Sequence, residues 1–207
     1  MKDTYIIRTE DDIEAVIGPQ IEKSKEKIYA ALDESMVEFI SRSPLMLIST
    51  IDAKGQVDVS PKGDSQGFVH IDGNGQLLIP DRPGNRLTFG FRNILQNDNV
   101  GLIFLVPNLR ETLRVRGTAT ITRDPAVLGE LSARGKPALL CTRVEINECF
   151  FHCGKALIRS SLWKPEEWEK QEESPMIKSI AKRYDADETA EHGIEEEIER
   201  TYRVNLY

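Results

Sequence analysis

Two short turn sequences divide part of the chain into apolar segments of strand length. Asp52-Ala53-Lys54-Gly55 and Asp72-Gly73-Asn74-Gly75 each lie between two such segments. Asp, Asn and Gly adopt turn conformations readily, so this pattern is typical of β-hairpins. The first predicted strand is apolar along its whole length, and in the second Val57 and Val59 are expected to point inward. The four predicted strands are Leu45–Ile51, Gln56–Ser60, Phe68–Ile71 and Gln76–Ile79.

Three further strands are expected in the following part of the chain. Val100–Val106 is apolar throughout, and Thr112–Thr122 alternates apolar and polar residues. Gly117 interrupts the apolar side of that alternation, which indicates a bulge or a close approach of another chain segment. Ala138–Cys149 completes the set. Six or seven strands joined mostly by hairpins favour a small antiparallel barrel, because closure leaves few exposed strand edges.

Helical patterns are expected at both ends of the chain. Thr9 is followed by acidic residues, as at a helix N-cap, and the apolar spacing over residues 34–41 predicts a helix. Asp124-Pro125 is expected to open a short helix, and the charged tail from Pro165 onward is also predicted to be helical. A chain of 207 residues can form one domain with a sizeable core. We therefore expect a single domain over 1–207, with helical extensions at about 1–43 and 165–207.

Two segments contain the residues expected to bind an anion. In Ile79-Pro80-Asp81-Arg82-Pro83-Gly84-Asn85-Arg86 an apolar strand ends at a Pro-Gly turn, and a helix is predicted to begin near Asn85. Arg82 and Arg86 flank that start, where unpaired backbone N–H groups favour a phosphate. In Ser60-Pro61-Lys62-Gly63-Asp64 another strand ends in a hydroxyl group and a lysine. Together the segments predict a phosphorylated small ligand held at strand ends.

The charge distribution supports a small anionic ligand. The net charge is −7, which argues against general nucleic-acid binding. Between Pro80 and Thr120, however, the sequence contains six arginines, no lysine and three acidic residues. This part therefore has a local net charge of +3. No apolar run is long enough for a membrane helix, and no export signal is evident. Three cysteines fit a reducing compartment, so we expect a cytoplasmic protein without membrane association.

A metal site is not expected. Cys149, His152 and Cys153 lie close together in the sequence, but zinc needs about four ligands at usable spacing. No second pair of His or Cys residues supplies the rest. No acid–base constellation stands out either, so the residues that would catalyse a reaction are unknown.

The order of these motifs resembles the pyridoxamine 5′-phosphate oxidase-like family of FMN-binding split barrels. The motifs are Ser-Pro-Lys-Gly-Asp, Ile-Pro-Asp-Arg-Pro-Gly-Asn-Arg, Glu-Thr-Leu-Arg-Val-Arg-Gly and the segment from His152 to Trp163, and the resemblance covers about Pro44 to Trp168. It implies a six-stranded antiparallel split barrel with flanking helices. It also implies a homodimer with FMN at the subunit interface.

The resemblance assigns expected roles to individual residues. One strand beside the flavin ring and phosphate would supply Asp58, Val59, Ser60 and Lys62. The second flavin-contacting strand and the phosphate loop would supply Ile79, Pro80, Asp81, Arg82, Asn85 and Arg86. Thr112 would lie near the flavin from a neighbouring strand, and Arg159 and Trp163 would contact the cofactor of the partner subunit.

The implied function is that of an FMN-dependent oxidoreductase acting on a small molecule, with NAD(P)H as a possible hydride source. A flavin performs the redox chemistry itself, which fits the missing acid–base constellation. The chain departs from the true oxidase where Val57 replaces an arginine, and it lacks that enzyme's Arg-Leu-x-Pro ending. The substrate is therefore open. Two alternatives are a non-catalytic flavin-binding or sensing protein and a split barrel that uses F420 or haem.

Overall fold

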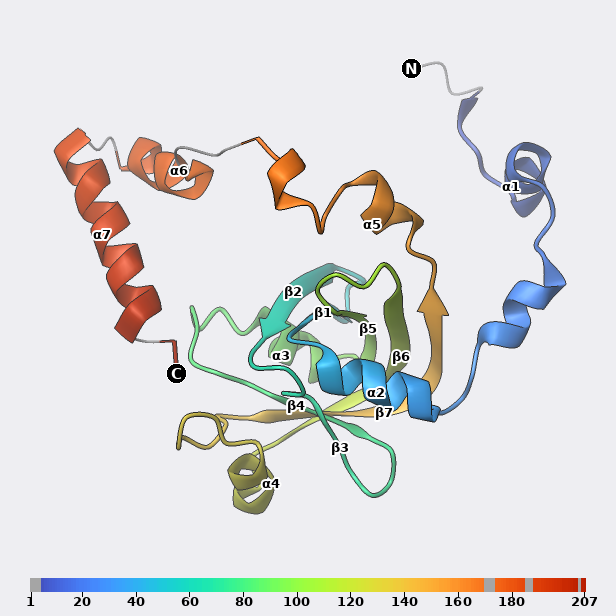
Figure 1. The fold of residues 1–207 in the computed structure, drawn as a ribbon, viewed down its shortest axis with the longest axis horizontal. Helices are drawn as coiled ribbons and strands as arrows, with labels where there is room; N and C mark the ends of the chain where they lie inside the picture. The colour runs from blue at the N-terminus through green and yellow to red at the C-terminus, as the bar shows by residue number, and fades with distance from the viewer. Residues whose placement is uncertain (1–4, 170–173, 185–187, 205) are drawn as a thin grey trace.

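The computed structural model describes residues 5–169, 174–184, 188–204 and 206–207, and one strongly curled sheet dominates the fold (Figure 1). Seven strands follow the order β2-β1-β5-β6-β7-β4-β3, and every neighbouring pair is antiparallel. The bounds are β1 Leu45–Ile51, β2 Val57–Gly63, β3 His70–Ile71, β4 Leu77–Pro80, β5 Asn99–Leu105, β6 Thr112–Thr122 and β7 Cys141–His152. The predicted mainly β split barrel is confirmed. The strand count is seven rather than six, because the two-residue β3 forms a ladder of its own with β4.

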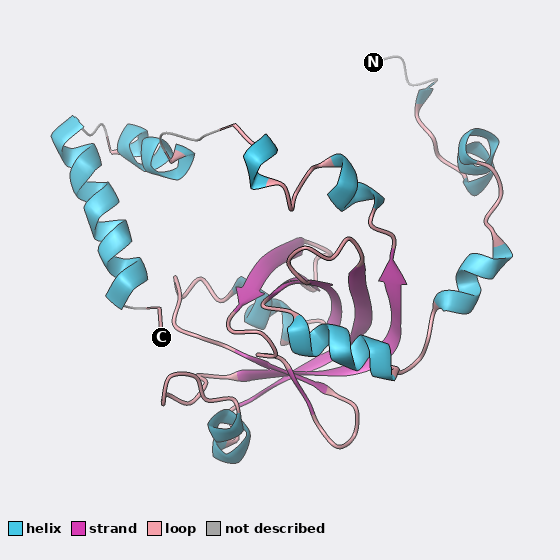
Figure 2. Cartoon of the chain, viewed as in Figure 1, coloured by secondary structure: helices cyan, strands magenta, loops and turns pink. Residues whose placement is uncertain are grey.

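Both predicted hairpins are present, and a backbone hydrogen bond closes each of them. The amide of Asp52 donates to the carbonyl of Gln56 at 3.0 Å, and the amide of Asp72 donates to the carbonyl of Gln76 at 3.0 Å. Gly55 and Gly75 both adopt positive φ angles, which residues with a side chain rarely do. Figure 2 shows the strands curling around a common interior.

The bulge predicted at Gly117 is also present. The register between β6 and β7 shifts between Arg116 and Gly117. A Cβ atom on Gly117 would overlap the backbone carbonyl oxygen of Glu145 and would lie 2.9 Å from Cγ1 of Val144. Glycine is needed here because β7 approaches the β6 backbone too closely for a side chain.

The prediction that Val57 and Val59 point inward is wrong. Both side chains are largely exposed, at 63% and 59%. On β1 the buried residues are Met46, Ile48 and Thr50, and their cross-strand partners on β2 are Lys62, Ser60 and Asp58. Directly paired residues face the same side of a sheet, so the polar residues of β2 face the interior. The pairing register with β1, which local alternation cannot reveal, decides the orientation.

Helices flank the sheet and occupy both terminal regions. Their bounds are α1 Glu10–Ile17, α2 Glu34–Arg42, α3 Phe89–Ile94, α4 Pro125–Glu130, α5 Lys155–Arg159, α6 Pro175–Arg183 and α7 Glu188–Val204, with 3-10 segments η2 Glu22–Lys27 and η3 Pro165–Glu167. The Thr9 cap is confirmed, since its side chain accepts a hydrogen bond from the amide of Asp12. Residues 1–4, 170–173, 185–187 and 205 of the predicted extensions lie outside the described residues. Within the described chain, no helix is long and apolar enough to cross a membrane.

Several predicted boundaries are wrong, among them the end of the second strand, which is Gly63 and not Ser60. The helix expected near Asn85 begins at Phe89, because the preceding residues form an extended loop in which Arg86 and Thr88 have positive φ angles. The strand expected over Ala138–Cys149 runs from Cys141 to His152. Ala138 instead packs with Leu131 in a small apolar cluster beneath α4.

Helix α2 allows a test of local stability. The Asp33 side chain caps this helix by accepting a hydrogen bond from the amide of Met36 at 2.8 Å. We expect Asp33→Ala to lower the free energy of unfolding by about 1 kcal/mol, because the amide loses its partner. Glu34→Ala, one residue further on, is the control and should have a smaller effect. Urea denaturation of both variants makes the comparison, and equal losses would contradict the capping role.

Candidate functional site

The candidate site lies where two incompletely paired strands approach each other. β2 stands at one end of the strand order. β3 pairs with Leu77 and Leu78 of β4, whereas β7 pairs with Leu77–Pro80, so within the described residues no strand flanks the β3 side of Ile79 and Pro80. An ion pair of 2.7 Å between Nζ of Lys62 and Oδ1 of Asp81 joins the two strands. Two partly unpaired backbone edges, one on β2 and one at Ile79 and Pro80 of β4, therefore lie side by side. We call this place the opening of the barrel.

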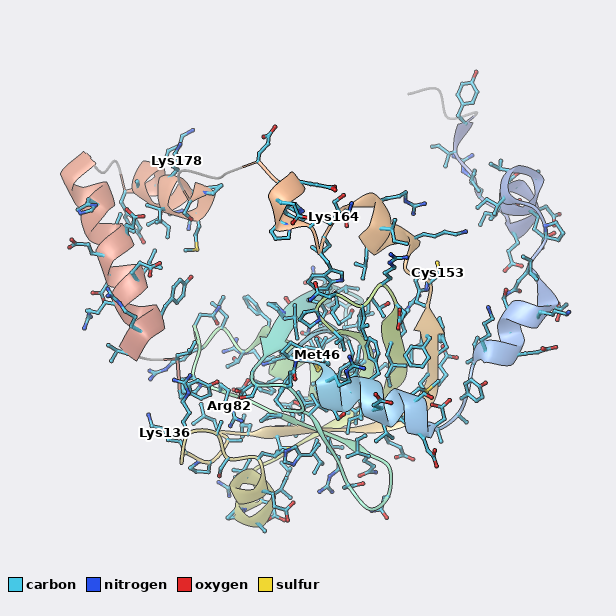
Figure 3. The ribbon with its side chains drawn as sticks, viewed as in Figure 1. Met46, Arg82, Lys136, Cys153, Lys164 and Lys178 are labelled. Carbon is cyan, nitrogen blue, oxygen red and sulfur yellow. The ribbon has the colours of Figure 1, made fainter. Side chains whose placement is uncertain are left out.

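A second ion pair lies beside the first and is more deeply buried. Nε of Arg82 donates to Oδ2 of Asp64 at 2.7 Å, and the two side chains are 16% and 2% exposed. Oδ1 of the same carboxylate accepts hydrogen bonds from the Tyr207 hydroxyl at 2.6 Å and from the amide of Ser65 at 2.8 Å. In Figure 3 Arg82 lies beside the place where the end of the chain returns to the barrel.

The Asp64 carboxylate is stabilised in its ionised form. Burial alone would raise its pKa, but the hydrogen bonds from Tyr207, Arg82 and Ser65, together with the charge of Arg82, outweigh burial and lower the pKa below its ordinary value. The pKa of Tyr207 is raised for the matching reason, because its hydroxyl proton is shared with Asp64. The phenol therefore stays protonated and acts as a donor.

Helix α3 covers the interior side of this opening. Nδ2 of Asn93 donates to Oγ1 of Thr50 at 3.0 Å, which ties the helix to β1. Nζ of Lys62 lies 5.2 Å from the ring centroid of Phe91. Lys62 is thus held between a carboxylate and an aromatic face, and its side chain is 27% exposed.

The loop between β4 and α3 is exposed and conformationally strained. Arg86 and Thr88 have φ angles of 59° and 56°, a region that a β-branched residue such as Thr rarely adopts. Oδ1 of Asn85 accepts a hydrogen bond from the amide of Leu87 at 3.0 Å, which tightens the loop. The Arg86 side chain is exposed, and within the described residues it forms no ion pair.

The strain at Thr88 can be measured. Because glycine adopts positive φ without a steric penalty, we expect Thr88→Gly to raise the free energy of unfolding by about 1 kcal/mol. Gly129→Ala, at a glycine with open space around it, provides a baseline for a glycine–alanine exchange in this chain. Thermal unfolding would settle the matter, and a clearly destabilised Thr88→Gly would contradict the strain.

The structure brings only part of the sequence-predicted set together. Lys62, Asp81 and Arg82 meet at the opening, and Asp58 lies further along β2, where Ser60 donates to it at 3.0 Å. Ile79 and Pro80 are buried. Asn85 and Arg86 lie on the exposed loop that follows Arg82, and the other predicted residues lie elsewhere. Val59 and Thr112 belong to the opposite, outer face of the sheet, Arg159 is exposed at the end of α5, and the Trp163 indole donates to the carbonyl of Leu109 at 2.7 Å.

Sequence reasoning missed several residues of the site. Asp64 belongs to the quoted Ser-Pro-Lys-Gly-Asp segment, but that segment assigns it no role, and its buried pairing with Arg82 depends on the fold. Thr50 and Phe91 come from elements whose packing depends on the whole fold. No signal in the sequence marks Tyr207, which lies 143 positions from its partner Asp64.

The donor set suits an anion better than a metal ion. Nε of Arg82 already donates to Asp64, whereas no described residue hydrogen-bonds the two terminal nitrogens of the Arg82 guanidinium group. These nitrogens can therefore form a bidentate pair of hydrogen bonds with a phosphate. Among the described residues, no three His, Cys, Asp or Glu side chains are arranged to hold a metal ion. Cys149 is buried, with its thiol 3.6 Å from the carbonyl oxygen of Tyr29.

Comparison with known proteins gives one family match. The family described as pyridoxamine 5′-phosphate oxidase matches residues 32–153, which include the whole sheet and both ion pairs. No curated protein matches the chain.

Solved structures that are similar to this chain each cover somewhat more than half of it. HupZ of Group A Streptococcus has a TM-score of 0.48 and 18% identity, over 58% of this chain and 98% of that protein. A putative pyridoxamine 5′-phosphate oxidase from Lactobacillus delbrueckii has a TM-score of 0.46 and 22% identity, over 59% and 95% of the two chains. HutZ, the haem storage protein from Vibrio cholerae, has a TM-score of 0.41 and 17% identity, over 60% and 97%.

Proposed function

Because the chain belongs to the pyridoxamine 5′-phosphate oxidase family, we propose that it is an FMN-binding flavoprotein that acts as an oxidoreductase on a small molecule. Family members bind flavins of several kinds. The observation that supports FMN is the pair of partly shielded cations, Lys62 and Arg82, at the point where two free strand edges meet. A ring can bind along backbone edges while cations hold a phosphate group.

Each part of the site would have a separate task in cofactor binding. Lys62, Arg82 and Arg86 would neutralise the phosphate of FMN, with Arg82 offering both terminal nitrogens. The backbone of Asp58–Ser60 and of Ile79–Pro80 would hydrogen-bond the polar rim of the ring, whereas the amide and carbonyl of Asp81 are already bonded to Leu140 and Leu139. A bound flavin supplies hydride and electron transfer, and the protein binds, orients and shields it. Asp81 and Asp64 already hold the two cations in place, so little side-chain entropy would be lost on binding.

We infer a homodimer that uses the outer face of the sheet. Val57, Val59 and Leu45 are 63%, 59% and 39% exposed there, an apolar surface that association would cover. Thr112 belongs to the same face, and a second subunit could bring Arg159 and Trp163 to the cofactor. Light scattering of the FMN-loaded protein measures this directly, and a monomer would contradict the inference.

The phosphate requirement provides the direct test of the proposed site. We expect FMN to bind about 100-fold more tightly than riboflavin, since two charge-assisted hydrogen bonds contribute about 3 kcal/mol together. Quenching of flavin fluorescence during titration measures both affinities. Equal affinities would contradict the phosphate site.

The oxidoreductase activity can be tested with NAD(P)H in the absence of oxygen. We expect NAD(P)H to bleach the absorbance of the bound flavin. A flavin that stays oxidised with NAD(P)H and with candidate reduced substrates would favour a non-catalytic binding protein.

Arg86 offers a variant with little effect on the fold. Its side chain is exposed and lacks an ion pair among the described residues. We expect Arg86→Ala to weaken FMN binding about 10-fold, to leave riboflavin binding unchanged and to leave thermal stability within about 0.5 kcal/mol. The same fluorescence titration makes the comparison. An equal loss for both ligands would mean that Arg86 contacts the ring or shapes the loop instead.

A further inference from the structure

The segment that follows the barrel leaves it and returns at Tyr207. The Trp163 indole fixes the start of this segment to Leu109, and the chain then continues through α6 and α7. These two helices pack on each other, with Ile177 and Ala181 buried. Figure 1 shows them standing away from the sheet before the chain end comes back beside it. We call the described residues 160–169, 174–184, 188–204 and 206–207 the strap.

Three contacts hold the returning end of the strap at Tyr207. Its hydroxyl donates to Oδ1 of Asp64 at 2.6 Å. Nζ of Lys136 donates to its main-chain carbonyl oxygen at 2.7 Å, and the guanidinium of Arg134 lies 4.4 Å from the centroid of its ring. Figure 3 shows Lys136 and Arg82 on the same side of the molecule, where these contacts gather. Two loops of the barrel, one after β2 and one between α4 and β7, therefore hold Tyr207.

Asp64 connects the contacts of Tyr207 to the candidate phosphate site. One oxygen of its buried carboxylate accepts from Tyr207 and the other accepts from Arg82 at 2.7 Å. The carboxylate can turn little while both oxygens are occupied, so the guanidinium plane of Arg82 is fixed as well. The two terminal nitrogens of Arg82 then keep one direction and remain available to a ligand.

We propose that Tyr207 is a positioning residue, which closes the strap onto Asp64 and thereby holds Arg82 for the phosphate of the cofactor. This inference rests on the proposed FMN function. Tyr207 itself need not touch the ligand, since it acts through Asp64. A protein with Tyr207 released would keep its barrel and its ring-binding edges but would hold the phosphate less well.

Tyr207→Phe tests the proposal because it removes the hydroxyl alone. We expect FMN binding to weaken about 10-fold while riboflavin binding stays unchanged, since only the phosphate depends on the orientation of Arg82. A purely structural role would change both affinities or neither. Arg134→Ala loosens the same ring without touching Asp64 and should reproduce the phosphate-specific loss at about 3-fold. Tyr202→Phe is the control, because its side chain is 55% exposed on α7.

The outcomes separate this inference from the proposed function. A wild-type protein that binds FMN and riboflavin equally would contradict the phosphate site itself, and the positioning role with it. A wild-type preference for FMN that Tyr207→Phe retains in full would overturn only the positioning role. Hydrogen exchange gives a second readout without cofactor, since the amides of α7 and of Ser65 should exchange faster in Tyr207→Phe than in Tyr202→Phe. Equal exchange in the two variants would show that Tyr207 does not close the strap.

Discussion

Replacing Arg82 with alanine is expected to weaken FMN binding about 100-fold and to lower the free energy of unfolding by about 3 kcal/mol. The loss of binding follows from the two terminal nitrogens that the wild-type side chain offers to a phosphate. The loss of stability follows from Asp64, whose carboxylate is 2% exposed and would remain charged without its cation. Fluorescence titration and urea denaturation measure the two effects separately.

The pH dependence of the Arg82→Ala effect has a definite sign. The folded-state pKa of Asp64 lies below its ordinary value of 3.8, so its pairing stabilises the protein above that pH and is lost as pH falls through the folded-state pKa. The stability difference between wild type and Arg82→Ala should therefore be largest near neutral pH and should shrink below about pH 4. Arg116→Ala is the matched control, since Arg116 is 64% exposed in its pair with Glu148 and should cost less than about 1 kcal/mol. A loss in Arg82→Ala that matched this control would contradict the buried pair.

Gly117→Ala is expected to destabilise the fold by more than about 3 kcal/mol or to prevent folding. The added Cβ would overlap the carbonyl oxygen of Glu145, which belongs to the backbone of β7 and cannot rotate away. Relief would require β6 and β7, the longest pair of strands, to separate at the bulge. The expected result is insoluble protein or a large fall in the midpoint of urea denaturation.

Gly101→Ala is a closely matched control for Gly117→Ala. Gly101 lies on the neighbouring strand β5 and pairs with Arg116, but its nearest new contact would be Cβ of Ser49 at 3.9 Å. Because this is an ordinary van der Waals distance, stability should change by less than about 1 kcal/mol. If both glycine variants lost stability equally, the cause would be strand propensity or backbone entropy and not the close approach of β7.

Local sequence signals were sufficient for most of the sheet. The two Asp- and Gly-containing turns fixed the hairpins, because turn chemistry depends on neighbouring residues alone. The bulge at Gly117 was visible for the same reason, as an interruption in a clean alternation. The orientation of Val57 and Val59 could not be predicted, because it depends on which β1 residues face them across the ladder.

The site was less accessible to prediction than the sheet. The sequence identified Lys62 and Arg82 as cations at strand ends, and the resemblance added Asp81, but neither could show that Asp81 pairs with Lys62 or that Asp64 pairs with Arg82. The predicted start of the helix near Asn85 was wrong, because Arg86 and Thr88 adopt positive φ angles that an α-helix does not allow. Tyr207 reaches the site only through the path of α6 and α7, which no local pattern encodes.

The central claim is that the opening between β2 and β4 binds FMN. Native protein, purified without added cofactor and denatured gently, should release a ligand that mass spectrometry identifies. The account predicts FMN at about one molecule per chain in the wild type and a clear reduction in Arg82→Ala. Release of F420 or haem in its place, or the absence of any ligand together with no binding of added FMN, would contradict the account.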